Sequence, residues 1–438
     1  MRGPVKLASN VQNAGKPAVG YSKGTMQEQT GTKAIVFSGG GAYGAYEVGV
    51  MKALSTGESP ATADKPLDAD VFTGTSVGNF NAAVLTMLPG NAADAAKRLE
   101  QIWLYEIADR GGARGNGVYR IRGNPPGYLE NTGFKNPFEP LFKAAGDAAY
   151  LGAQWAMRAT QFMTSSGALS NRALGLIDVS AFISVDPFVE MLQRTIMPAR
   201  IRVSPKILRI IATNWDTGEV KVFTNKDITD EDGRAAIMAS ASIPGVFPPV
   251  KIGENSFVDG GVVMNTPISY ALDAGATELH VIYLNPDVRT VPLQATESTI
   301  DVFDRVMSTV MCNMINQDIA TATTINKGLE ALERVAADAP LDPTHANNML
   351  RVVSKIYKSI EADQPYRKIT IHRHHPSKDL GGPLSILNFS QGQIRDFIEL
   401  GYNDTRSHDC VRNGCLIPNR AYESLPTHMP RTISASGA

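Results

Sequence analysis

The first strong structural signal in the chain is the stretch AIVFSGGGAYGAYEVGV, residues 34–50. A short apolar run enters three successive glycines, and an apolar pattern with helical spacing follows them. This order predicts a buried strand, a tight turn and a helix. Gly39, Gly41 and Gly44 match G-x-G-x-x-G, the pattern of a dinucleotide-binding turn. Because other anions also bind at helix N-termini, the motif alone does not identify the ligand.

Short β-rich runs alternate with helical patterns over much of the chain. Strand-like runs occur at residues 33–38, 70–73, 207–215, 219–225, 256–261 and 278–285, and helical patterns at 233–243 and 266–275. Strands that alternate with helices favour a mostly parallel sheet with helices on both faces. The sequence therefore predicts an α/β fold.

Composition divides the chain into four parts. Residues 1–31 are rich in Gly, Ser, Asn, Gln and Lys without periodicity, which predicts a flexible N-terminal arm. Residues 32–290 carry the α/β pattern. Residues 291–406 are mainly helical, with helices expected at 298–336, 344–362 and 390–406 and a strand-like run at 366–376, and residues 407–438 form a tail.

An insertion at about residues 110–170 interrupts the α/β pattern. A loop rich in Gly, Arg and Pro (110–136) precedes an amphipathic pattern at 140–169, whose prominent apolar residues are Trp155, Met157, Phe162 and Met163. One interpretation is a helix packed permanently on the core. The other is a mobile cover or a membrane-touching surface.

Charge and cysteine content exclude several classes of protein. The chain has 438 residues, 43% of them hydrophobic, and a formal net charge of -1, so it lacks the basic surface of a nucleic-acid-binding protein. Its three cysteines are Cys312, Cys410 and Cys415. Cys410 and Cys415 have neither the spacing of a zinc pair nor a second pair nearby, so we predict ordinary thiols, no metal and no cofactor.

The N-terminal residues also bear on location. They lack the continuous apolar segment of a signal peptide, and no stretch is long and apolar enough to span a bilayer. We therefore expect a cytoplasmic protein with peripheral membrane association. Export without a signal peptide stays an alternative.

A second glycine turn supplies a candidate nucleophile. Residues 74–78 read Gly-Thr-Ser-Val-Gly, a G-x-S-x-G motif between a short strand and a helix. A serine at this point lies on a sharp turn, so its hydroxyl is exposed at the carboxyl end of the sheet. The Val77 N–H and the helix N-terminus point toward the reacting atoms. The context predicts that Ser76 is a nucleophile and that Gly74 and Gly78 make room for the turn.

The histidines are weak candidates for the base that Ser76 needs. His280 lies within an apolar strand, which indicates a core position. His372, His374 and His375 lie in the basic run HRHHP, which indicates a solvent-exposed strand end. A Ser–His–Asp esterase of the α/β-hydrolase type, using His375 or His408, stays an alternative.

Asp259 is the better candidate for the base. It ends a short strand and is followed by Gly260 and Gly261, which let the backbone turn tightly and leave the carboxylate at the strand tip. A free aspartate, with a pKa of about 4, is a weak base. It can still accept the Ser76 proton in a dry site where the oxyanion is stabilised.

The first glycine turn can provide that stabilisation. The N–H groups of Gly39, Gly40 and Gly41 can converge on one negative oxygen. A nucleotide-binding turn would also need an acidic residue at the end of the second strand, but Thr73 leads directly into the Ser76 turn. We therefore favour an oxyanion hole and keep a Rossmann-like nucleotide-binding protein as an alternative.

Three motifs in this order resemble those of the patatin-like phospholipase family: GGGAYG at 39–44, GTSVG at 74–78 and DGG at 259–261. Residues 239–250 and 259–282 are also similar, and the resemblance covers about residues 32–286. It implies a three-layer α/β/α domain and a catalytic Ser–Asp dyad without histidine. The implied activity is calcium-independent hydrolysis of fatty-acyl esters of phospholipids, lysophospholipids or neutral lipids.

The resemblance assigns roles by position. Ser76 would be the nucleophile and Asp259 the base, and the oxyanion hole would be formed by Gly39, Gly40 and Gly41 with the Val77 N–H. Many members have Arg or Lys where this chain has Tyr43, so the headgroup preference stays open. The expected partner is a lipid surface, and we expect the helical region after residue 290 to bind a protein activator or a second copy of the chain. A catalytically idle scaffold is the remaining alternative.

Overall fold

The computed structural model describes residues 31–109, 116–122, 139–164, 182–230, 232–284, 319–331, 368–381 and 383–418. The flexible arm expected at 1–31 lies, apart from Gly31, outside these residues, as do most of the loop at 110–136 and most of the tail after residue 407.

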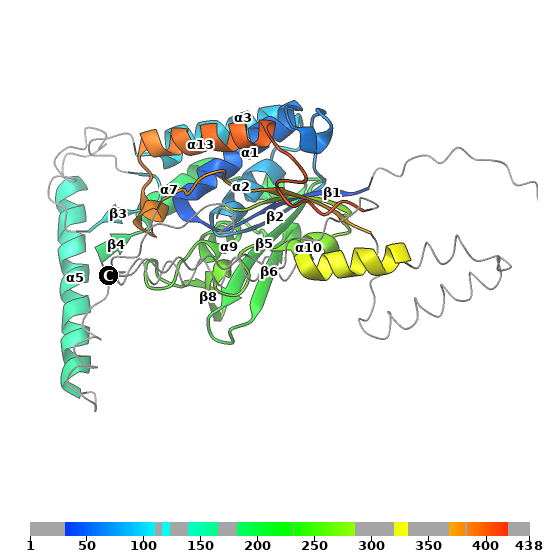
Figure 1. Cartoon of the computed structure of the whole chain (residues 1–438). Coiled ribbons are helices and arrows are strands. Elements are labelled where there is room, and N and C mark those ends of the chain that lie inside the picture. Colours follow the sequence, from blue (N-terminus) through cyan, green and yellow to red (C-terminus); the bar gives the residue numbers. More distant parts are fainter. Residues whose placement is uncertain are drawn as a thin grey trace, which may run out of the picture. The chain divides into compact units, whose positions relative to one another are not determined.

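A mostly parallel sheet forms the centre of the fold (Figure 1). Its eight strands follow the order β10-β9-β1-β2-β5-β8-β7, with β6 also paired to β5. The parallel strands are β1 (Lys33–Phe37), β2 (Val71–Thr75), β5 (Ile207–Asn214), β9 (Glu278–Ile282) and β10 (Thr370–His374). The antiparallel strands are β6 (Val220–Thr224), β7 (Val250–Ile252) and β8 (Asn255–Asp259). A separate two-stranded sheet pairs β3 (Arg120–Ile121) with β4 (Ile183–Ser184).

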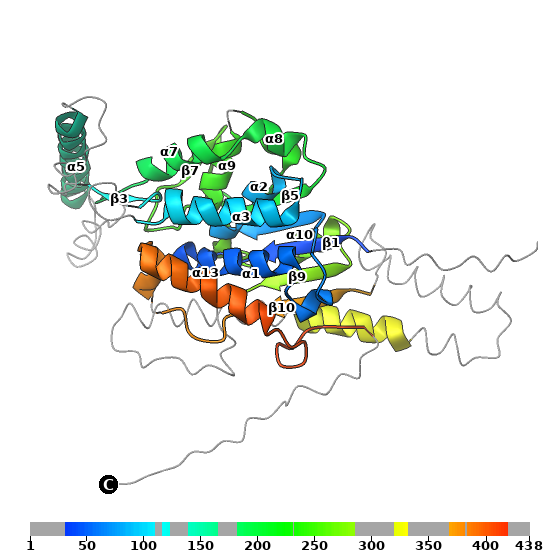
Figure 2. The same ribbon diagram turned by 90° about the horizontal axis from the view of Figure 1, so that it is seen from above.

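Helices cover both faces of the central sheet, as the alternation along β1 requires. Ile35 and Phe37 belong to the core on one face, and Ala34 and Val36 to the core on the other. The first face carries α1 (Gly44–Thr56), α2 (Val77–Thr86), α3 (Ala92–Ile102), α9 (Gly233–Ser240) and α13 (Gln391–Arg406). The opposite face carries α10 (Ile268–Asp273) and the helical residues 319–331. Figure 2 shows α1, α3 and α13 side by side. The predicted three-layer α/β/α fold is confirmed.

Shorter elements connect these layers. The remaining α-helices are α5 (Glu139–Thr164), α7 (Asp186–Thr195) and α8 (Pro198–Arg202), and Trp103–Ile107 form a π-helical turn. The 3₁₀ turns are η1 (Gly41–Tyr43), η2 (Pro60–Thr62), η6 (Asn225–Asp227), η7 (Gly260–Val262) and η8 (Pro383–Leu387).

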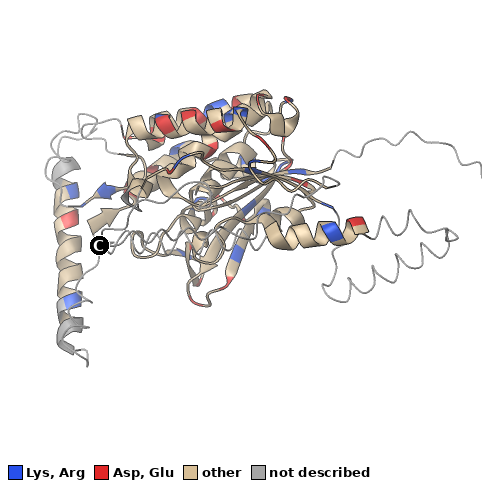
Figure 3. Cartoon of the chain, in the orientation of Figure 1, with Lys and Arg blue, Asp and Glu red and all other residues tan. Residues whose placement is uncertain are grey.

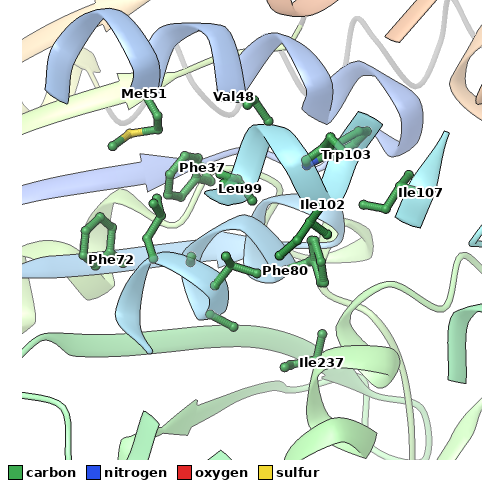
Figure 4. Close-up of a cluster of buried hydrophobic side chains, with 14 of the residues drawn as sticks. Phe37, Val48, Met51, Phe72, Phe80, Leu99, Ile102, Trp103, Ile107 and Ile237 are labelled. Atoms are coloured by element: carbon green, nitrogen blue, oxygen red, sulfur yellow. The ribbon is translucent and has the colours of Figure 1, made fainter. Parts of the chain in front are cut away.

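Large apolar side chains fill the space between the sheet and its first helical layer. Figure 4 shows Phe37 and Phe72 from the strands facing Phe80, Leu99 and Trp103 from the helices. Trp103 is fully buried and donates its indole N–H to Asn81 Oδ1 at 2.8 Å, so its one polar atom is satisfied.

The segments after residue 290 contribute to the same layers. β10 pairs in parallel with β9, with Thr370 opposite Glu278. α13 packs along α1. The strand-like run and the last helix predicted there are thus present, while most of the two earlier helices lie outside the described residues. The domain boundaries at residues 290 and 406 stay predictions.

The histidines of β10 correct one expectation. His372 and His374 are only 8% and 2% exposed, instead of lying at a solvent-exposed strand end. They are buried because β10 pairs with β9 on one side and with the chain near Leu416 on the other. His280 is fully buried, as expected for a core position.

The amphipathic pattern at 140–169 forms α5, a helix of 26 residues. Trp155 is 66% exposed, and Phe142 and Met157 are more than half exposed. The side chains of Phe162 and Met163 lie outside the described residues. Asp147 ties the helix to β3 through an ion pair with Arg120 at 2.6 Å.

The structure agrees with the charge and hydropathy of the sequence. No helix in the described ranges is both long and apolar enough to cross a membrane. In the cartoon of Figure 3, both Lys or Arg and Asp or Glu positions are distributed over the described elements.

Candidate active site

Ser76 lies at the sharp turn between β2 and α2. Its backbone angles, φ 55° and ψ -130°, are unusual for a residue with a side chain. The Ser240 hydroxyl supports the turn: it accepts the Ser76 N–H at 3.1 Å and donates to the Ile211 carbonyl. The predicted strand–turn–helix context of the candidate nucleophile is therefore present.

Sheet register brings Asp259 to the same place. Thr75, the last residue of β2, pairs with Ile211 of β5. The next residue of β5, Ala212, pairs with Asp259 of β8. β8 thus takes the place of β2 beside β5 at the point where β2 turns away into Ser76. Two residues that are 183 positions apart in the sequence become neighbours.

The Asp259 carboxyl group is almost fully buried. Its Oδ1 atom accepts the Gly261 N–H at 2.7 Å. Burial raises the pKa of Asp259 to about 6, although the nearby Ser76 hydroxyl and the Gly261 N–H lower it. The Oδ2 atom is buried and forms no hydrogen bond of good geometry within the described residues. Hydrogen bonds between catalytic groups are often poorly aligned before substrate binds.

The N–H groups of the first glycine turn differ in whether they are already hydrogen-bonded. The Gly39 N–H is donated to the Asn265 carbonyl at 3.2 Å, and the Asn265 amide donates back to the Gly39 carbonyl at 3.3 Å. Within the described part of the chain, no hydrogen bond occupies the N–H groups of Gly40 and Gly41. Gly41 has φ 53°, and a side chain there would collide with the Ile386 carbonyl. Gly40 and Gly41 are thus better placed than Gly39 to donate to an oxyanion.

The start of α2 offers one further donor. Val77 is the first residue of this helix, so its N–H has no partner within the helix. Because α2 begins directly after Ser76, this N–H lies beside the serine side chain.

A buried polar network holds the glycine turn, and sequence reasoning missed it. Glu47 is fully buried, and its carboxyl group accepts the Ser38 N–H at 3.0 Å and the Asn81 amide at 2.7 Å. Burial raises the pKa of Glu47 well above its ordinary value. Asn81 accepts the Trp103 indole N–H. The network joins the strand end before the glycines to α1, α2 and the turn after α3.

Tyr43 ends the 3₁₀ turn η1, which begins at the last of the three glycines. Its ring packs edge-on against Phe397 of α13, with centroids 5.6 Å apart, and its hydroxyl donates to the Gly381 carbonyl at 2.8 Å. The side chain therefore holds the segment between β10 and α13 over the glycine turn.

An apolar cavity opens beside Ser76. It is partly open to solvent. Its walls are almost entirely apolar and include Trp103, Phe188, Met191, Phe247 and Phe389. Ser76 and Val77 border it, so an extended apolar chain in the cavity would end at the serine.

Most of the described histidines gather near Cys410 and Cys415 rather than at Ser76 and Asp259. None of the five that the structure describes is hydrogen-bonded to Ser76 or Asp259. His280, His372, His374 and His408 lie on β9, on β10 and after α13, together with Cys410 and Cys415. Among the described residues, two groups of side chains could hold a metal ion: His372, His408, Cys410 and Cys415 form one, and Glu278, His280 and His372 form the other.

Comparison with known proteins identifies the family. The sequence model of the family described as patatin-like phospholipase matches residues 35–272, more than half of the chain. The chain therefore belongs to the patatin-like phospholipase family, as its motifs indicated.

Two individual proteins are also similar. A protein of invertebrate iridescent virus 6 named "Probable lipid hydrolase 463L" is 36% identical over 67 residues, which span 15% of this chain and 23% of the viral protein. The crystal structure of VipD from Legionella pneumophila aligns with 85% of this chain and 67% of that chain, at 14% identity and a TM-score of 0.32.

Proposed function

We propose that this protein is a serine acyl hydrolase of the phospholipase A or lysophospholipase type, which cleaves fatty-acyl esters of membrane lipids without calcium. The observation that carries the proposal is the pairing of β5, which changes from β2 to β8 at the end of β2. This change brings the buried carboxyl group of Asp259 next to Ser76 at the strand–helix turn. Membership of the patatin-like phospholipase family and the short match to a viral protein named as a probable lipid hydrolase support the same activity.

The reaction begins when Ser76 Oγ attacks the ester carbonyl carbon and Asp259 accepts the hydroxyl proton. The carbonyl oxygen becomes an oxyanion, which the N–H groups of Gly40, Gly41 and Val77 stabilise. Asp259 then returns the proton to the leaving alcohol oxygen, and an acyl-serine remains. Water attacks this ester, again losing a proton to Asp259, and the fatty acid and free serine are released.

The apolar cavity explains why a fatty-acyl ester suits the site. Burial of hydrocarbon contributes about 0.8 kcal/mol per CH₂ group. A pocket lined by aromatic and methionine side chains can therefore contribute to the binding energy of a fatty-acyl substrate. It gives a nucleotide few polar partners.

The other functions considered receive less support. A Ser–His–Asp esterase needs a histidine at the serine, and none of the described histidines is there. A nucleotide-binding protein needs a ribose-binding acid after β2, where Ser76 lies instead. A scaffold without activity does not account for a carboxyl group kept buried beside the serine.

Kinetics of dyad variants test the proposal. Ser76→Ala and Asp259→Asn should each lower turnover of a soluble p-nitrophenyl ester and of a lysophospholipid by at least about 10³-fold, and the double variant should lose little more. The matched controls are Ser269→Ala and Asp273→Asn, two exposed residues of α10. Both variants should keep wild-type rates. Added calcium should leave turnover of the soluble ester unchanged. Near-wild-type turnover by Asp259→Asn would contradict the dyad.

A further inference from the structure

Four side chains with metal-ligating atoms meet at the edge of the central sheet, apart from the dyad. His372 comes from β10, while His408, Cys410 and Cys415 come from the chain that follows α13. One ligand atom from each of the four lies within 4.8 Å of every other. Figure 2 shows this segment leaving α13 and passing beside β10.

The separations fit a tetrahedral site. Cys410 Sγ lies 3.6 Å from both His372 Nδ1 and His408 Nε2, and Cys415 Sγ lies 3.3 Å from His408 Nε2. A zinc ion with Zn–S bonds of about 2.3 Å and Zn–N bonds of about 2.0 Å holds its sulfur and nitrogen ligands about 3.5 Å apart. The three S–N separations thus match a tetrahedral zinc ion, and the remaining pairs of ligand atoms lie within 4.8 Å of one another.

The backbone holds these corners in place. The Cys415 N–H bonds the Cys410 carbonyl at 2.9 Å, which closes the loop between the two cysteines. Asp409 Oδ1 accepts the Val411 and Arg412 N–H groups at 2.8 and 3.1 Å, which fixes the start of the same loop.

Further hydrogen bonds join this loop to the sheet. Two backbone bonds of 2.8 and 2.9 Å connect Leu416 to Ile371, next to His372. The Arg373 N–H donates to Cys415 Sγ at 3.2 Å, as backbone groups commonly do to thiolate ligands of metals. The loop is therefore built onto β10, with Cys410 beside His372 and Cys415 beside His408.

The ligand types select the metal. Two sulfurs and two imidazole nitrogens form a Cys₂His₂ set, which prefers zinc over the oxygen-binding calcium and magnesium. A second group, Glu278 with His280 and His372, shares one histidine with the first but offers no thiolate. The set that contains both cysteines is therefore the zinc site.

We propose that His372, His408, Cys410 and Cys415 bind one structural Zn²⁺ ion, which fastens the chain after α13 to the edge strand β10. Four protein ligands complete the tetrahedron and leave no position for a substrate, as in other structural zinc sites. Sequence reasoning missed this site because the cysteine pair lacks a second pair nearby. His372 lies 38 residues before Cys410 and reaches it only through the fold.

Metal content of the purified full chain tests the proposal. Elemental analysis should find about one equivalent of zinc per chain. Cys410→Ser and Cys415→Ser should each lower this content at least about tenfold. Cys312→Ser is the matched control, because it removes the remaining thiol of the chain and should keep the zinc.

Cobalt substitution decides the question even if the cysteine variants fail to fold. Wild-type protein reconstituted with Co²⁺ should show the intense visible absorption of tetrahedral cobalt bound by thiolates, and Zn²⁺ should abolish it. Removal of the zinc by a chelator should lower the melting temperature, and added Zn²⁺ should restore it.

Two results would overturn the zinc site. One is folded protein without zinc that has two reactive thiols at Cys410 and Cys415. The other is a Cys410–Cys415 disulfide, detected by mass spectrometry of the unreduced protein. Neither result bears on Ser76, so this proposal and the proposed hydrolase activity fail separately.

Discussion

In the proposed mechanism Asp259 must be ionised to accept the proton of Ser76, and burial of its carboxyl group makes ionisation harder. An ordinary aspartate is almost fully ionised at pH 5. Burial raises the pKa of Asp259 to about 6, so the base is largely protonated at that pH. Protonation at acidic pH should therefore remove activity while the active site stays otherwise intact.

The pH profile of turnover measures this effect. We expect kcat/KM for a soluble ester to be constant above pH 7 and to fall about tenfold per pH unit below a pKa of about 6. Enzyme held at pH 5 and returned to pH 7.5 should recover its rate, which separates protonation from unfolding. A rate that stays constant down to pH 5 would show that Asp259 is not the base.

Short-range patterns made Ser76 and Asp259 candidates, and their roles as nucleophile and base stay predictions. A serine between small residues at a strand–helix junction and an aspartate before two glycines are local patterns. The supporting residues could not be predicted in this way. Asn265 and Ser240 reach the glycine turn and Ser76 from segments about 160 to 230 residues away, through hydrogen bonds that only the fold creates.

At the scale of elements, α1 and α13 pack with unusually close backbones. A Cβ atom on Gly49 would lie against the Ile398 carbonyl and 2.6 Å from the Tyr402 nitrogen. A Cβ atom on Gly401 would collide with the Tyr46 carbonyl. Gly49 of α1 faces α13, and Gly401 of α13 faces α1. This contact positions α1 behind the glycine turn.

Alanine at either glycine should separate the two helices. We expect Gly49→Ala and Gly401→Ala each to lower the free energy of unfolding by about 1–3 kcal/mol, measured by urea denaturation. Gly392→Ala is the matched control, because a Cβ there has nothing within 4 Å and alanine favours the helix. Equal stability of all three variants would show that the contact tolerates the added methyl groups.

The exposed apolar side chains of α5 make this helix the best described candidate for a membrane contact. Trp155 is 66% exposed. Full burial of a large apolar side chain is worth about 1.5–3 kcal/mol. We propose that α5 docks on lipid surfaces and covers the acyl-chain groove there.

Tryptophan fluorescence tests the docking of α5. Trp215, which is 55% exposed, is replaced by Phe, while the fully buried Trp103 is kept because it bonds Asn81. Phospholipid vesicles should then shift the Trp155 emission to shorter wavelengths. Trp155→Ala/Met157→Ala should lose activity on vesicles and keep activity on soluble esters. An unchanged spectrum with full vesicle activity would exclude membrane docking by this face.

Strands and helices were predictable where a periodic pattern is strong, as in β1, β5 and α13. The position of β10 was not, because the partner of an edge strand depends on tertiary packing rather than on its own residues. Its basic run HRHHP predicted exposure, yet pairing with β9 and Leu416 buries two of these histidines.

At the scale of the whole molecule, segments from both ends of the described chain build one site. Ile386 contacts the glycine turn, and Leu387 and Phe389 line the cavity beside Ser76. Tyr43 and Phe397 hold these segments together. The family motifs cover Ser76, Asp259 and the glycine turn, but part of the wall of the cavity comes from residues after 380, which no motif marks.

We propose that Ser76 is an activated nucleophile, and covalent labelling of its hydroxyl is the direct test. A fluorophosphonate probe is incubated with folded wild-type protein, with Ser76→Ala and with heat-denatured wild type, and labelled peptides are mapped by mass spectrometry. If Ser76 is activated, we expect one probe per folded wild-type chain, attached to Ser76, and no label on the other two samples. Equal labelling of Ser76→Ala, or folded wild-type protein that hydrolyses esters while Ser76 stays unlabelled, would contradict it.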